Sequence, residues 1–319
     1  MTGFVSWPGR ANLSTLALVL LVGLPAYAAE DSGESDEAAY SRDGADTCLR
    51  CHDEGAEVPV TEIFRTPHGL AADKRTPFGQ LQCESCHGPG GKHTGRVRRG
   101  QERPPMIEFG SDEETPVPEQ NTICEGCHKG QLGTGWHGGT HASAELSCAD
   151  CHSVHVAKDP VLVTATQPQV CFDCHRSQRA DSLKFSSHPL RFGKMACGDC
   201  HDPHGSIAEN DLRGNNLNDT CYECHTEKRG PFLWEHAPVA EDCSLCHASH
   251  GSNHPALLKR RAPLLCQQCH SQRGHPSVAH GSSGLPTQGG SPFLGGQSCA
   301  NCHSQVHGSN HPSGARKTR

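Results

Sequence analysis

The stretch Cys48-Leu49-Arg50-Cys51-His52 contains a Cys-x-x-Cys-His pattern that recurs along the chain and decides how the rest of the sequence is read. This pattern is the attachment signature of c-type haem. On a helical turn, positions i, i+3 and i+4 share one face, so two thiols reach the vinyl groups of one porphyrin while the imidazole reaches its iron. The pattern therefore predicts covalent capture of a haem and ligation of its iron by the same five residues.

All 20 cysteines fall into ten such motifs, numbered here one to ten in chain order, and we therefore predict ten covalently bound haem c groups. Zinc ribbons, thioredoxin-like redox pairs and disulfide frameworks also use paired cysteines, but none of them requires a histidine directly after every second cysteine. The predicted haem-binding cysteines are Cys48, Cys51, Cys83, Cys86, Cys124, Cys127, Cys148, Cys151, Cys171, Cys174, Cys197, Cys200, Cys221, Cys224, Cys243, Cys246, Cys266, Cys269, Cys299 and Cys302. The predicted proximal iron ligands are His52, His87, His128, His152, His175, His201, His225, His247, His270 and His303.

The composition suits a chain whose core is built from cofactor. Hydrophobic residues make up 34% of the 319 residues, a figure that includes the cysteines, and aromatic residues only 5%. With 35 Gly and 22 Pro, the fold class predicted is a multihaem cytochrome c, mostly irregular with short α-helices and little or no β-sheet. We expect an elongated chain of ten haems built as repeated haem pairs. The net charge of -7 argues against a nucleic-acid partner.

Histidine supplies the second axial ligand of each iron in this prediction, because the chain has 24 His and only three Met. Two axial histidines favour low reduction potentials and leave an iron to exchange electrons rather than to bind substrate. The predicted distal ligands are His68, His93, His141, His155, His188, His204, His236, His250, His275 and His307. At one position the choice stays open, since spacing favours His280 over His275. The surplus His137, His254 and His311 are expected at the surface or in support of a ligand.

The spacing of the distal histidines alternates along the chain. After odd-numbered motifs the next histidine comes late, as from His52 to His68, and after even-numbered motifs it comes early, as from His152 to His155. The repeating unit is therefore predicted to be a haem pair, used five times. An early histidine cannot reach the far face of its own haem, so it is expected to ligate a neighbouring iron. Because motif starts are 22 to 41 residues apart, consecutive haems should lie close together.

The N-terminus predicts export. An apolar run at 13–25 follows Arg10 and ends in Ala26-Tyr27-Ala28, where a signal peptidase would cleave. The predicted organisation is a signal peptide at 1–28, an acidic flexible leader at 29–46, a decahaem cytochrome domain at 47–312 and a C-terminal tail at 313–319. Without a twin-arginine signal, the chain is expected to acquire haem outside the cytoplasm.

Several long runs resemble the MtrA and DmsE type of periplasmic decahaem c-type cytochrome, the outer-membrane electron conduit family. They span Cys48 to about Gly314, and the most specific are Cys83-Glu84-Ser85-Cys86-His87-Gly88-Pro89, residues 155–162, 186–190, 227–231, 233–239 and 302–312. In that family a Gly-His follows the ninth motif, which matches Gly274-His275 and favours His275 as the ligand.

The resemblance implies an electron-transfer protein, not an enzyme, located in the periplasm and associated with the outer membrane. It would sit partly inside an outer-membrane β-barrel porin and conduct electrons between periplasmic c-type cytochromes and an extracellular multihaem cytochrome or surface reductase. Such a conduit serves anaerobic respiration of extracellular metals or other acceptors, or oxidation of ferrous iron. The alternatives are a freely diffusing periplasmic electron carrier and a multihaem nitrogen-oxyanion reductase, which needs a five-coordinate iron although no Cys-x-x-Cys-Lys variant is present.

Overall fold

The computed structural model describes residues 40–55, 60–130, 132, 135–270, 299–301, 303–312 and 314–316. All of them belong to one compact unit, Ala38–Arg319. The predicted signal peptide, most of the acidic leader, Cys302 and both candidates for the last distal ligand, His275 and His280, lie outside the described residues.

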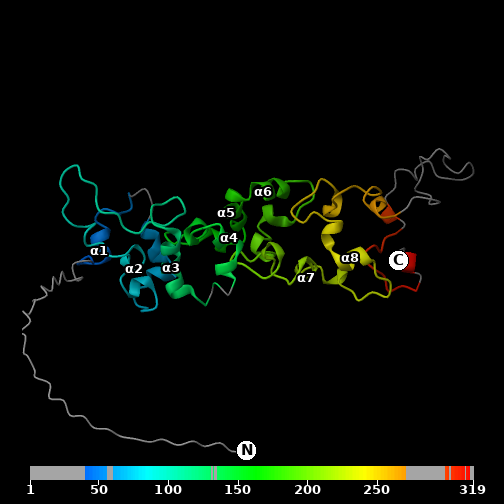
Figure 1. Cartoon of the computed structure of the whole chain (residues 1–319), viewed down its shortest axis with the longest axis horizontal. Helices are drawn as coiled ribbons and strands as arrows, with labels where there is room; N and C mark the ends of the chain where they lie inside the picture. Colours follow the sequence, from blue (N-terminus) through cyan, green and yellow to red (C-terminus); the bar gives the residue numbers. More distant parts are fainter. Residues whose placement is uncertain are drawn as a thin grey trace, which may run out of the picture. The chain divides into compact units, whose positions relative to one another are not determined.

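The described chain is mostly irregular and contains short helices without a β-strand, as predicted (Figure 1). The longest helix, α3, has 12 residues and ends on the third motif. The α-helices are α1 (Ala45–Cys48), α2 (Glu84–His87), α3 (Val117–His128), α4 (Thr140–Ser143), α5 (Gln167–Cys174), α6 (Arg176–Ser182), α7 (Leu217–Tyr222) and α8 (Ala237–Glu241).

Short 3-10 helices connect and extend these elements. They are η2 (Val60–Arg65), η3 (Pro67–Gly69), η4 (Pro77–Gly79), η5 (Trp136–Gly138), η6 (Cys148–Asp150), η7 (Pro160–Leu162), η8 (Pro189–Phe192), η9 (Cys197–Asp199), η10 (Glu209–Asp211), η11 (Thr226–Lys228), η12 (Cys243–Leu245), η13 (Pro255–Leu257), η14 (Cys266–Gln268), η16 (Cys299–Asn301) and η17 (Gly314–Arg316). Among the residues that the structure describes, no helix has the length and apolar composition needed to cross a membrane.

Apolar side chains form only a small part of the buried interior. The larger buried ones, such as Phe78, Trp136 and Phe172, lie far apart in the sequence, whereas Gln120 and Ser147 are almost fully buried polar residues. The Ser147 hydroxyl donates to Gln120 Oε1, and the Gln120 amide donates to the carbonyls of Gly110 and Thr115. Hydrogen bonds between buried polar groups therefore stabilise much of the interior that an apolar core would stabilise in other proteins.

Four amide side chains each link an odd motif to the even motif that follows it. The Asn121 Oδ1 accepts the N–H of Cys148 at 2.9 Å, and the Asn218 Oδ1 accepts the N–H of Cys243 at 2.8 Å. Gln82 Oε1 accepts the N–H of Ala45, and Gln167 Oε1 accepts the N–H of Gly198. We call these four contacts the amide links. They join motifs one to two, three to four, five to six and seven to eight.

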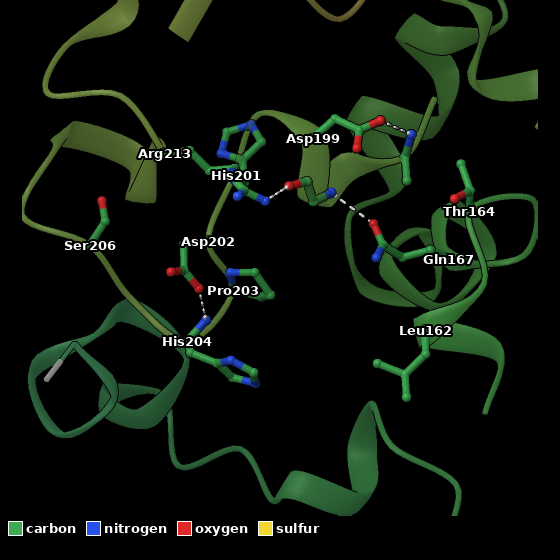
Figure 2. Close-up of a pocket in the computed structure, with 12 residues that line it drawn as sticks. Leu162, Thr164, Gln167, Asp199, His201, Asp202, Pro203, His204, Ser206 and Arg213 are labelled. Carbon is green, nitrogen blue, oxygen red and sulfur yellow. Dashed lines mark hydrogen bonds between the residues drawn. The ribbon is translucent and has the colours of Figure 1, made fainter. Parts of the chain in front are cut away.

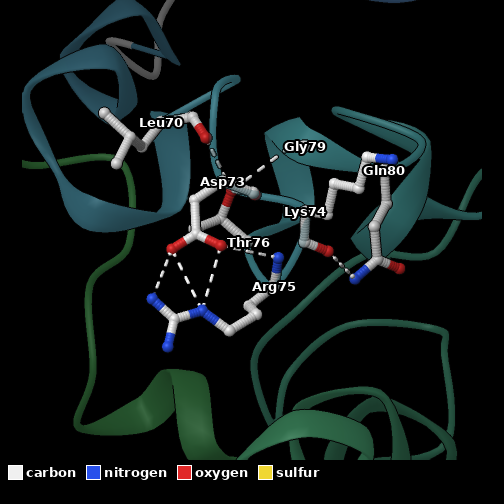
Figure 3. Close-up of polar contacts among 7 residues, drawn as sticks. All are labelled: Leu70, Asp73, Lys74, Arg75, Thr76, Gly79 and Gln80. Carbon is white, nitrogen blue, oxygen red and sulfur yellow. Dashed lines mark hydrogen bonds and ion pairs between the residues drawn. The ribbon is translucent and has the colours of Figure 1, made fainter.

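A turn with its own polar contacts connects η3, which carries His68, to η4 (Figure 3). The Arg75 guanidinium donates to both carboxylate oxygens of Asp73, and the Thr76 hydroxyl accepts the N–H of Gly79. The hydrogen bonds from Arg75 lower the pKa of Asp73 to about 2. The turn thus fixes the path between His68 and the second motif.

Candidate functional site

Each described motif closes one turn of helix by a backbone hydrogen bond from the histidine to the first cysteine. The N–H of His52 donates to the Cys48 carbonyl at 3.0 Å, and the same bond is 2.9 Å in the fourth motif between His152 and Cys148. The turn places the two cysteines and the histidine on one side, as the attachment of a porphyrin requires.

Nine of the ten proximal histidines face a second histidine across a gap of nearly constant width. Two imidazoles that bound one metal ion from opposite sides, through metal–nitrogen bonds of about 2.0–2.1 Å, would have ring centres about 6 Å apart. The pairs, with the distance between ring centroids, are His52 and His93 (6.4 Å), His68 and His128 (5.9 Å), His87 and His155 (6.0 Å), His141 and His175 (6.0 Å), His152 and His204 (6.1 Å), His188 and His225 (6.5 Å), His201 and His250 (6.1 Å), His236 and His270 (6.0 Å), and His247 and His307 (6.1 Å).

The pairing follows a rule that sequence reasoning left open. A histidine after an odd motif faces the proximal histidine of the next odd motif, as His141 faces His175. A histidine after an even motif faces the proximal histidine of the preceding even motif, as His250 faces His201. At the N-terminal end His93, after motif two, faces His52 of motif one. Each early histidine therefore faces the proximal histidine of a different motif from the one that it follows in the sequence.

Hydrogen bonds fix which nitrogen of these rings carries the proton. The Nδ1 of His201 lies 2.9 Å from the Asn210 carbonyl, and that of His236 lies 2.9 Å from the Val306 carbonyl. Similar contacts to backbone carbonyls are made by His87, His93, His141, His188, His247 and His303. Because a carbonyl only accepts, Nδ1 must donate, so in the neutral ring Nε2 is the nitrogen whose lone pair can bind a metal.

Burial lowers the pKa of several of the paired imidazoles and so favours the neutral state that a metal ligand requires. Desolvation is the main cause that lowers the pKa in each case, and a neighbouring proximal histidine lowers it further. The residues affected are His68, His155, His204, His250 and His307.

Consecutive motifs lie next to one another through their cysteines. The first cysteines of the two motifs in each consecutive pair, from motifs one and two to motifs nine and ten, lie close enough to shift each other's pKa: Cys48 and Cys83, Cys124 and Cys148, Cys171 and Cys197, Cys221 and Cys243, and Cys266 and Cys299. The second cysteines of an even motif and the next odd motif also interact: Cys86 with Cys127, Cys151 with Cys174, Cys200 with Cys224, and Cys246 with Cys269. The ten motifs thus form an unbroken series of neighbours.

Comparison with known proteins now identifies the family. A relative called Multiheme cytochrome MtrA from Shewanella baltica (strain OS185) is 51% identical over 280 residues, which cover 87% of this chain and 82% of the relative. The chain belongs to the MtrA family of multihaem c-type cytochromes. It is an electron-transport protein that binds haem covalently, and through the haem it binds iron.

Two family models and a more distant relative agree with this membership. The model of a doubled CXXCH motif matches residues 188–230 and 236–275, and the model of NrfB-like c-type cytochromes matches residues 83–167. Cytochrome c-type protein NrfB from Haemophilus influenzae (strain ATCC 51907 / DSM 11121 / KW20 / Rd) is 26% identical over 197 residues, 53% of this chain and 84% of the relative.

The residues present fit haem c. None of the described cysteines is joined in a disulfide, so each sulfur is available for a thioether bond to haem. A pocket of about 480 Å³ next to η9 shows the surroundings of two of the paired histidines (Figure 2). It is lined by His201 and His204 together with Arg213 and the apolar Leu162. Imidazole, an apolar side chain and a cation are groups that a porphyrin with carboxylate arms could contact.

The surplus histidines take different positions. The His137 side chain is 78% exposed and lies 3.7 Å from Glu125, while His254 is half-buried and His311 is exposed. His303, the predicted proximal histidine of motif ten, is held by its Nδ1 contact with the Arg316 carbonyl.

Sequence reasoning missed the amide links, although an asparagine three residues before both Cys124 and Cys221 was a signal that could have revealed two of them.

Proposed function

We propose that this chain holds ten haem c groups, each with two axial histidines, and conducts electrons between the periplasm and the cell surface through an outer-membrane barrel. The observation that carries the proposal is the set of nine histidine pairs at 5.9–6.5 Å, since each leaves room for one iron and closes both axial positions. Haem, when bound, supplies a one-electron ferric/ferrous couple.

We assign the iron ligands according to the pairing rule. The nine pairs take nine irons, and His303 is the proximal ligand of the tenth. The distal position of the tenth iron goes to the histidine after motif nine, because no later odd motif exists for that residue to face. We assign His275 to this position on the resemblance to the family, with His280 as the alternative.

The haem-pair repeat accounts for the two kinds of contact between motifs. Contacts between first cysteines, reinforced by the amide links at four of the five pairs, join the two members of a pair. Contacts between second cysteines join one pair to the next. Since the cysteines of every motif interact electrostatically with those of its neighbours in the series, we infer a path of short electron-transfer steps from motif one to motif ten.

Optical and EPR spectra of the purified holoprotein test the ligation. Ten haems per chain by pyridine haemochrome assay, all low-spin and with no ferrous iron that binds carbon monoxide, are expected. A high-spin population that binds nitrite would instead favour a multihaem nitrogen-oxyanion reductase.

Fractionation of the native host tests the location. We expect the haem-stained chain to co-purify with an outer-membrane porin and an extracellular multihaem cytochrome or surface reductase, and to lack residues 1–28 by mass spectrometry. Recovery of the chain alone in the periplasmic fraction would instead make it a freely diffusing electron carrier.

A further inference from the structure

The fourth motif differs from its neighbours in the partner of its proximal histidine. His152 places Nδ1 at 2.7 Å from a carboxylate oxygen of Asp159, whereas His87, His201 and His247 make the corresponding contact with a backbone carbonyl. A carboxylate carries a full negative charge, so this hydrogen bond is of the stronger, charge-assisted kind.

The loops after motifs six and eight show what Asp159 replaces. In each of them the acceptor is the carbonyl nine residues after the proximal histidine, at Asn210 and at Ala256, and both of these residues have a positive φ near 57°. After motif four the acceptor is seven residues away and is a side chain. The fourth motif therefore uses a charged group where two equivalent motifs use a neutral one.

Asp159 is held in place by its own contacts. It is the N-cap of η7, and its second carboxylate oxygen accepts the N–H groups of Val161 and Ser153, each at 3.3 Å. The Asp159 side chain is 13% exposed and the His152 side chain 34%. Water therefore screens this charge only in part, which strengthens its effect on the imidazole.

We propose that Asp159 is a positioning residue that lowers the reduction potential of the haem held by motif four. This inference rests on the proposed function, because it needs an iron between His152 and His204, whose rings are 6.1 Å apart. A carboxylate that accepts the Nδ1 proton makes the imidazole a more basic ligand, and a more basic ligand stabilises the ferric state. The haem of motif four is then harder to reduce than it would be with a neutral acceptor.

The position of motif four gives this residue a role in conduction. Its cysteines interact electrostatically with those of motif three on one side and of motif five on the other, so in the proposed series electrons that cross the chain pass through motif four. A haem with a lowered potential is rarely the one that holds an electron. In the partly reduced protein, Asp159 therefore favours electrons on the haems before and after motif four over the haem of motif four itself.

The test is a spectroelectrochemical titration of the complete holoprotein and of Asp159→Asn and Asp159→Ser. Serine can still cap η7 but cannot reach His152, so the second variant separates the carboxylate from the turn. We expect a component with the amplitude of one haem to become at least tenfold easier to reduce in both variants, a rise of about 59 mV for a one-electron couple.

Two matched substitutions serve as controls. Glu227→Gln removes a carboxylate 3.9 Å from the Nδ1 of the proximal His225, beyond hydrogen-bonding distance and with both side chains more than half exposed. Asp242→Asn alters a carboxylate that caps η12 next to motif eight. Both controls are expected to titrate like the parent.

The possible results separate this inference from the proposed function. Titrations of both Asp159 variants that superimpose on the parent, or a shift to lower potential, would overturn the role of Asp159. Loss of haem from the peptide containing Cys148 in both variants would also overturn it, because Asp159 would then be needed for attachment. A parent protein without haem on that peptide would instead contradict the proposed function.

Discussion

The amide link of Asn218 offers a direct test of how polar contacts replace an apolar core. Its Oδ1 accepts the Cys243 N–H at 2.8 Å, and its Nδ2 donates to the carbonyls of Val239 and Ala240 at 3.0 and 3.2 Å. Those carbonyls belong to the last turn of α8, where the helix supplies no donor. Asn218 is 8% exposed, so Asn218→Ala leaves one donor and two acceptors without their protein partner.

A buried polar group that loses its partner costs about 1–3 kcal/mol. Ala240 is exposed and its carbonyl can turn to water, so the loss falls mainly on Cys243 and Val239. We expect a total of about 2 kcal/mol, which is roughly a 30-fold change in the unfolding equilibrium and a melting temperature lower by about 4–8 °C.

Thermal melting of holoprotein with matched haem content, followed by loss of the low-spin absorbance, measures this change. Asn215→Ala, three residues earlier on an exposed side chain, is the control and should melt like the parent. If Asn218→Ala also melted like the parent, the view that the amide links hold motif pairs together would be refuted.

Three further predictions follow from the same geometry. His307→Ala should leave the iron of motif eight with one axial histidine, so one haem per chain becomes high-spin and binds carbon monoxide when reduced, whereas His311→Ala, four residues on, should leave the low-spin spectrum unchanged. Gly251→Ala should cost at least about 1 kcal/mol in chemical denaturation, because Gly251 has a φ of +151° and a Cβ there would meet the Asp181 carbonyl, whereas Gly126→Ala points a methyl group into open space and should be tolerated. Asp73→Asn should alter acid stability in a defined window: since Arg75 lowers the pKa of Asp73 to about 2 from an unfolded value of about 3.9, the stabilising contribution of Asp73 is present above pH 4 and lost as the pH falls to 2, so the difference between parent and variant in an acid titration should shrink between those limits.

The sequence predicted the parts of the site whose spacing is fixed by covalent chemistry. Two thioethers and one imidazole on the same haem require Cys-x-x-Cys-His on a single helical turn, so the motifs and their short helices could be read directly. The distal histidines could be proposed by counting, because methionine is scarce. The low fraction of apolar residues in the chain was likewise enough to exclude a conventional hydrophobic core.

The pairing of histidines could not be read in the same way. His201 and His250 are brought together by the turns after motifs five to eight, among them the bridge between Ser186 and Ser252, and nothing in the local sequence states that geometry. Asp159 was equally hidden, since it is one of 35 acidic residues and only the fold places it on His152. Long-range contacts of this kind depend on loop conformation rather than on residue type.

The pairing rule also means that the five motif pairs are not independent modules. A boundary placed between two consecutive motifs from motif two to motif nine, and after the paired histidine that follows the first of them, is crossed in both directions by histidine pairs. After His188, for example, the forward pair of His188 with His225 and the backward pair of His204 with His152 both cross it. Each side of such a boundary supplies a ligand that the other side needs, so neither segment alone can close all of its irons with the assigned histidines. In a chain with so few apolar side chains, these reciprocal ligands take the place of the interface that holds the repeats of other proteins together. If the proposed ligand assignment holds, folding and completion of the haem sites are one process along the whole series.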